Sequence, residues 1–94
     1  MKEQTLKKQV DGLVFDMMKI KAGQVAEFQK VIGKPEAVTE FANLLVKSGA
    51  VVSVPDEWGD FDKSSANDWI DLPWVVYVRV QNDFVYTLAN FTAI

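Results

Sequence analysis

The stretch WVVYVRVQNDFVYTLANF, residues 74–91, can form either one long helix or a hairpin of two strands. Its many Val, Tyr and Phe residues favour strands, and Asn82-Asp83 could form the tip of a hairpin. The spacing favours a helix, because polar and apolar residues fall on opposite sides at helical intervals. The polar side holds Arg79, Asn82, Asp83, Tyr86, Thr87 and Asn90, and the apolar side holds Val76, Val80, Phe84, Leu88 and Phe91. We therefore predict a helix, and Asp71 and Pro73 are suited to begin it.

Two further helices are predicted in the middle of the chain. In the first, apolar residues recur at helical spacing before Gly33, which can end the helix in a left-handed conformation; they are Val25, Phe28 and Ile32. The second has Pro35 at its first position and Gly49 after its last turn. Its apolar stripe consists of Val38, Phe41, Ala42 and Leu45.

Two strands complete the predicted fold. Leu13–Ile20 alternates apolar and polar residues imperfectly, and Ala50–Val54 is a short apolar run that Pro55 ends. The whole chain, residues 1–94, is expected to form a single α+β domain, with two or three helices packed on a minor β-sheet. We expect the polar residues 1–9 to fray.

Composition bounds the function. With 94 residues, 49% of them hydrophobic, the chain can build one compact core but not two. It has no Cys and no His, which excludes Ser-His-Asp and Cys-His triads and ordinary zinc sites. We therefore expect neither an enzyme nor a bound cofactor. A domain this small would gain stability from a partner that covers apolar surface, so we consider a homo-oligomer as well.

Charge is unevenly placed along the chain. Residues 1–47 hold eight Lys and six acids, whereas residues 48–94 hold one Lys and one Arg against seven acids. An acidic second half disfavours nucleic-acid binding, which needs Lys and Arg gathered on one face. The longest apolar run, Trp74 to Val78, is too short to span a membrane, and residues 1–9 lack the apolar core of a secretory signal. We expect a soluble, cytoplasmic protein.

The most informative segment for function is an acidic loop, residues 56–73. Together with Trp74 it holds all three tryptophans and six acids against one basic residue, Lys63. We expect Trp58 to be exposed between charged neighbours, and Trp69 and Trp74 to belong to the packed end of the loop. We predict a binding surface for a basic protein partner in which Trp58 or Trp74 enters the partner's pocket. The predicted surface consists of Asp56, Glu57, Trp58, Asp60, Asp62 and Trp74.

A calcium site is the main alternative for this loop. Residues 60–71 resemble the calcium loop of EF-hands in the positions of their oxygen-bearing side chains, which are Asp60, Asp62, Ser64, Asp68 and Asp71. The pattern departs at Ser65, where EF-hands have Gly, and at Asp71, which is shorter than the usual Glu. In the competing interpretation, Ser65 caps a short turn that contains Asp68.

Two other uses of the acids are weaker. Asp56/Glu57 and Asp60/Asp62 could act as the paired carboxylates of a glycosidase, but positions within one loop do not imply a cleft between them. An acidic inhibitor of a basic or nucleic-acid-binding protein would need more carboxylates over a larger face.

From Gly12 to Phe91, the order of features resembles that of small tail-assembly chaperones of long-tailed bacteriophages. The likeness rests on a strand with a basic-apolar ending (Met17 to Lys21), a helical middle (Gln24 to Lys47), and an Asp-rich connector that leads through DLPWVV to an amphipathic helix. It implies a non-enzymatic protein that binds the tape-measure protein and tail subunits and often oligomerises. It supplies no functional residues. Our leading hypothesis is a protein-interaction module of this kind.

Overall fold

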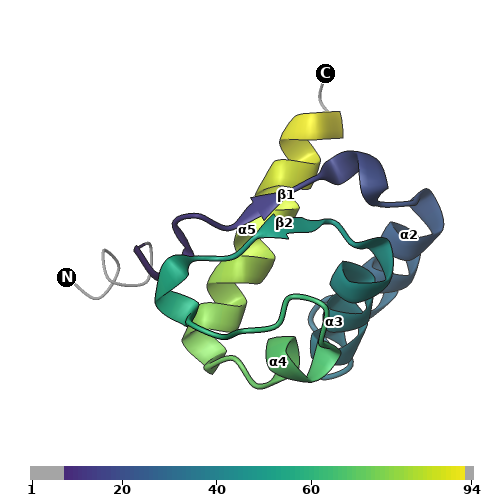
Figure 1. Ribbon diagram of the computed structural model, residues 1–94. Helices are drawn as coiled ribbons and strands as arrows, with labels where there is room; N and C mark the ends of the chain where they lie inside the picture. Colours follow the sequence, from purple (N-terminus) through teal and green to yellow (C-terminus); the bar gives the residue numbers. More distant parts are fainter. Residues whose placement is uncertain (1–7, 93–94) are drawn as a thin grey trace.

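The computed structural model describes the backbone of residues 8–92 and the side chains of residues 8–90 (Figure 1). Its elements in chain order are β1 (Val14–Phe15), the 3-10 helix η1 (Met17–Lys19), α2 (Ala22–Val31), α3 (Ala37–Ser48), β2 (Val51–Ser53), the 3-10 helix η2 (Asp56–Trp58), α4 (Ala66–Ile70) and α5 (Trp74–Thr92). The predicted α+β fold is confirmed: helices dominate, and the two strands form a minor sheet. Most of the segment expected to fray, residues 1–7, lies outside the described residues; residues 8–10 are helical.

Residues 74–92 form one helix, α5, as the spacing predicts. The amide of Tyr77 donates to the Pro73 carbonyl at 2.9 Å, so the chain enters the helix at the predicted position. One side of α5 is buried, and it consists of Val76, Tyr77, Val80 and Phe84. β-branched residues lower helix propensity only slightly, and burial of this apolar side outweighs that cost.

The predicted strand Leu13–Ile20 is wrong beyond its first residues. Strand β1 contains only Val14 and Phe15 and pairs antiparallel with β2 through an irregular register. The reason is Asp16, whose side chain accepts a hydrogen bond from the Met18 amide at 3.1 Å and caps η1. Asp offers the backbone a local alternative to a sheet ladder, and here that alternative prevails. The second strand is confirmed, although it spans only Val51–Ser53.

Helices α2 and α3 lie close to their predicted positions. Gly33 (φ 85°) and Gly49 (φ 66°) both adopt left-handed conformations, and the Gly49 amide donates to the Leu45 carbonyl, closing α3. Two details were predicted wrongly. Ile32 follows the last residue of α2 and is exposed, and Pro35 belongs to the turn before α3 rather than to its first position.

Four phenylalanines from different elements form the centre of the core. The ring of Phe84 on α5 lies 5.4 Å from Phe15, 6.2 Å from Phe28 and 5.3 Å from Phe41, measured between centroids. All three pairs are edge-to-face, a favourable arrangement for aromatic rings. The Phe84 ring thus brings α5 into contact with β1, α2 and α3. The last turns of α5 extend beyond the other elements (Figure 1).

Two valines of α5 offer a matched test of this packing. Val80 is fully buried, whereas Val85, one turn further on, is 40% exposed. We expect Val80→Ala to lower the free energy of unfolding by about 2 kcal/mol, since it removes buried methyl groups and leaves a cavity. Val85→Ala should change it by less than about 0.5 kcal/mol. Urea unfolding measures both, and equal effects would contradict the assigned helix orientation.

Tyr77 gives the fold a signature at high pH. Burial raises the pKa of Tyr77 from its ordinary value of 10.0 to about 12. The unfolded chain therefore loses the phenolic proton first, and stability falls as pH rises from 10.0 to about 12. In a Tyr86→Phe variant, the remaining phenol should titrate in ultraviolet absorbance with a pKa of about 12. An ordinary pKa in that variant would show that Tyr77 is not buried.

Candidate functional site

The acidic loop is folded around two of its three tryptophans. The indole N–H of Trp69 donates to the Lys63 carbonyl at 3.0 Å, and that of Trp58 donates to the Gln9 carbonyl at 2.7 Å. The rings of Trp58, Phe61 and Trp69 contact one another edge-to-face. Trp69 is buried as expected, but Trp58 is partly buried, so the prediction that it is exposed is wrong. Its long-range hydrogen bond is the reason, because that bond holds the indole against the start of the described chain.

Trp74 is also placed differently from the prediction. It is 68% exposed and stacks on Tyr77, with ring centroids 5.7 Å apart, instead of belonging to the packed end of the loop. It faces a hollow beside the turn between α2 and α3, where Gly33 and Pro35 contribute to the wall. Trp58 lines a different hollow. The two tryptophans therefore do not form one patch.

The hollow at Trp58, which we call the loop hollow, has a volume of about 300 Å³. Its walls come from the acidic loop, from the start of α5 and from the segment before β1; they are Gln9, Glu57, Trp58, Phe61, Leu72, Pro73 and Val76. Most of this lining is apolar, and exposed Glu57 is its only charged member. The Oε1 atom of Gln9 is buried and has no hydrogen-bond partner among the residues that the structure describes. The loop hollow thus combines a mainly apolar lining with one carboxylate.

Three further acidic residues of the predicted surface belong to the loop that contributes Glu57 to the hollow. The predicted residues Asp56, Glu57, Asp60 and Asp62 are all exposed, and none forms an ion pair with another described residue. The single basic residue of the loop points elsewhere, because Lys63 donates to the Val52 carbonyl at 2.7 Å. Unpaired exposed carboxylates set up a negative potential that attracts a cationic partner.

A further charged group lies on the neighbouring side of α5. Burial raises the pKa of Asp83, while the positive charge of Arg79 lowers it and the negative charge of Asp11 raises it. The Nε atom of Arg79 is buried, and no described residue forms a hydrogen bond with it. The two side chains are part of the molecule's electrostatic field, but they do not line the loop hollow.

The oxygen-bearing side chains of the calcium-like motif accept hydrogen bonds within the loop itself. Asp62 accepts a hydrogen bond from the Ser64 amide at 2.9 Å, and Asp68 accepts one from the Asp62 amide at 2.7 Å. The side chain of Ser65 accepts from the Asp68 amide, so the predicted cap is confirmed. Within the described residues, no three acidic side chains are grouped in a way that could hold a metal ion. The geometry favours the capped turn over the calcium loop.

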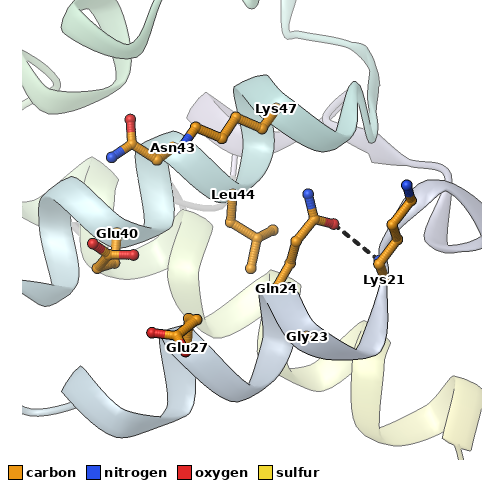
Figure 2. A pocket seen from close by; sticks show the side chains of 8 residues that line it. All are labelled: Lys21, Gly23, Gln24, Glu27, Glu40, Asn43, Leu44 and Lys47. Carbon is orange, nitrogen blue, oxygen red and sulfur yellow. Dashed lines mark hydrogen bonds between the residues drawn. The ribbon is translucent and has the colours of Figure 1, made fainter.

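Figure 2 shows a second hollow, of about 470 Å³, between α2 and α3. Glu27 and Glu40 lie at one end, Lys21 and Lys47 lie at the other, and Leu44 stands between the two helices. Glu27 already forms an ion pair with Lys30, with 3.2 Å between Oε1 and Nζ. Gln9 and Arg79 hold the buried polar atoms that lack a partner among the described residues, and neither residue lines this hollow. This hollow therefore separates two acids from two lysines. No motif in the sequence marks it, because its residues come from two helices.

No protein-family model, curated protein or solved structure matches the chain. Across residues 8–92, no helix combines the length and the apolar character that crossing a membrane requires. The loop hollow joins two predicted binding residues, Glu57 and Trp58, to an apolar cavity, whereas the hollow at Trp74 contains one.

The capped turn beneath the loop hollow can be tested directly. Ser65→Ala removes the acceptor at the start of α4 and should lower the free energy of unfolding by about 1 kcal/mol. Ser65→Asp, which retains an acceptor, should restore most of the loss. Ser64→Ala is the matched control, because only the backbone amide of Ser64 takes part in a hydrogen bond. Equal losses for the two alanine variants in urea unfolding would contradict the cap.

Proposed function

We propose that this protein is a non-catalytic interaction module that binds a basic segment of another protein at the loop hollow. The observation that carries the proposal is an apolar cavity lined by one exposed carboxylate, Glu57, in a loop that carries three more exposed acids of the predicted surface without an ion pair among the described residues. Apolar contact at the centre with charge at the rim is the usual anatomy of a protein interface. The rim charges speed association with a cationic partner, and the buried centre supplies the affinity.

The partner, rather than this chain, provides the inserted side chain. Trp58 is fixed by its hydrogen bond to Gln9 and acts as a wall of the loop hollow. An apolar side chain of the partner would enter between Phe61 and Leu72, while neighbouring Lys or Arg side chains meet Glu57 and the other acids. After a small rotation, the unpartnered Oε1 of Gln9 could accept a hydrogen bond from the partner. This reverses the arrangement expected from the sequence, in which a tryptophan of this chain is inserted.

For the wider role, we propose that the module assists assembly, as in the tail-assembly chaperones of bacteriophages. Support for this role comes only from the order of features along the sequence. The lack of Cys, which removes disulfides, is compatible with the cytoplasmic setting that such a role requires. The partner would then be a basic segment of a tail component.

Site-specific crosslinking tests the binding site. A photo-crosslinking amino acid at Glu57 should capture a basic protein in the organism that makes this chain, whereas the same group at Glu27 on α2 should not. The yield should fall with rising salt, since screening acts over about 8–10 Å at moderate ionic strength. The same adducts from both positions would contradict the proposal.

Charge variants extend the test once a partner has been captured. Asp56→Asn with Glu57→Gln should slow its association by about 3- to 10-fold, because the steering field is weakened. The matched control is Glu27→Gln with Glu36→Gln, which removes equal charge from another part of the surface. An unchanged association rate in the first variant would rule out steering by these acids.

A further inference from the structure

The side of α5 that faces away from the core is apolar and uncharged. Trp74 and Tyr86 are 68% and 69% exposed, and Val75 and Val85 are 53% and 40% exposed. At 100° per residue, these four fall on one face together with Val78, Asn82 and Ala89. None of the seven residues carries a charge, in a chain that has 23 charged residues in total. An exposed apolar strip along a whole helix marks a surface that another molecule covers.

Two hollows lie along one edge of this face, one near each end of α5. One, of about 470 Å³, lies beside the first turns of α5, where the turn after α2 contributes Pro35 to its wall. The other, of about 620 Å³, lies beside Val85 and Leu88, with Met17 and Val25 on its far side. No acidic residue lines either hollow, and the charged lining residues are Lys34 in the first and Lys21 in the second. This edge can therefore accept apolar side chains from a helix laid along α5.

We propose that the occupant is α5 of a second copy of this chain, packed antiparallel about a two-fold axis near Asn82. In such a pair, two residues face each other when their numbers add up to about 164. The sequence therefore gives the partner of each residue on the face. Trp74 and Val75 meet the small Ala89, and Val78 meets Val85 and Tyr86. Asn82 meets its own copy, and its amide can both donate and accept a hydrogen bond. A two-fold interface requires this self-complementarity, with large residues facing small ones and no charge facing another.

Asn82 accounts for the register. Apart from the Tyr86 hydroxyl and the Trp74 indole N–H, its amide is the only polar side-chain group among the seven, and it lies at the middle of the strip. A single Asn within an apolar helical seam fixes register and the number of strands, at some cost in stability. A shift of one turn toward the start of α5 would set the amide against Val78, which has no hydrogen-bonding group in its side chain, and this is unfavourable.

The available area suits a reversible dimer. With ordinary side-chain areas, the two exposed aromatics and two exposed valines contribute roughly 500 Å² per copy, hence about 1,000 Å² for the pair. Val78, Asn82 and Ala89 add to this value. Specific interfaces begin at about 1,200 Å², so the pair reaches the lower limit of that class. The loop hollow is lined by Val76, on a different side of α5, and stays open in the dimer.

Sedimentation equilibrium over a range of concentrations tests the dimer without any other partner. The chain should change from one to two copies as its concentration rises. Asn82→Glu sets two carboxylates against each other at the axis and should raise the dissociation constant by at least about 30-fold. Thr39→Glu adds the same charge at an exposed position of α3 and should leave it unchanged. A single-chain mass up to millimolar concentration, a larger assembly, or equal effects of the two variants would overturn the proposal.

Engineered cysteines test the antiparallel orientation, and the absence of native Cys makes the result easy to interpret. Under mild oxidation, a mixture of Val75→Cys and Ala89→Cys chains should form the mixed disulfide, whereas each variant alone should stay uncrosslinked. Far-UV circular dichroism verifies that each variant folds. Homodimeric disulfides from Val75→Cys alone would indicate parallel helices and overturn the arrangement. Failure to capture a basic protein at the loop hollow would leave both results unaffected.

Discussion

The ring of Phe84 ties the fold together. Phe15, Phe28 and Phe41 each place an aromatic edge or face against it, so a two-residue strand and two helices are fixed to α5 at one point. A sheet with so few residues supplies little stability of its own, because an isolated pair of strands is marginal in water. Strand β1 is held in place by the packing of Phe15 on Phe84 of α5. The position of every other surface in the molecule follows from the orientation that this contact gives to α5.

That orientation divides the surface of α5 in two. Val76 faces the acidic loop and helps to line the loop hollow, while Trp74, two residues earlier, faces the opposite flank. A 200° rotation between positions two apart on a helix accounts for this separation. The sequence places the two residues side by side, yet the helix sends them to different surfaces. The acidic loop contributes to the surface at Val76, and no acidic residue among those described lines the hollow at Trp74.

Periodic elements could be predicted from sequence, and irregular ones could not. The spacing of apolar residues correctly identified α5 and the stripe of α3, because burial imposes a period on any amphipathic helix. The end of β1 depends on one side-chain hydrogen bond of Asp16, which competes with the sheet locally. The exposure of the tryptophans depends on contacts between distant residues, such as the bond from Trp58 to Gln9, and no local pattern encodes these. The acids of the candidate site stand out in the sequence, whereas its apolar cavity is formed by segments that are far apart in the chain and that no local pattern brings together.

The two surfaces reinforce each other if both are used. A two-fold pair of α5 helices would carry two loop hollows, one on each copy, facing away from the shared axis. A partner with two basic segments could then engage both, and the second contact would form at a high effective concentration. Weak individual sites would suffice for stable but reversible capture, which suits a module whose own interface is near the lower size limit for specific association. Pairing through the uncharged face of α5 would thus strengthen binding at the acidic loop, because it doubles the number of loop hollows without adding a contact to either of them.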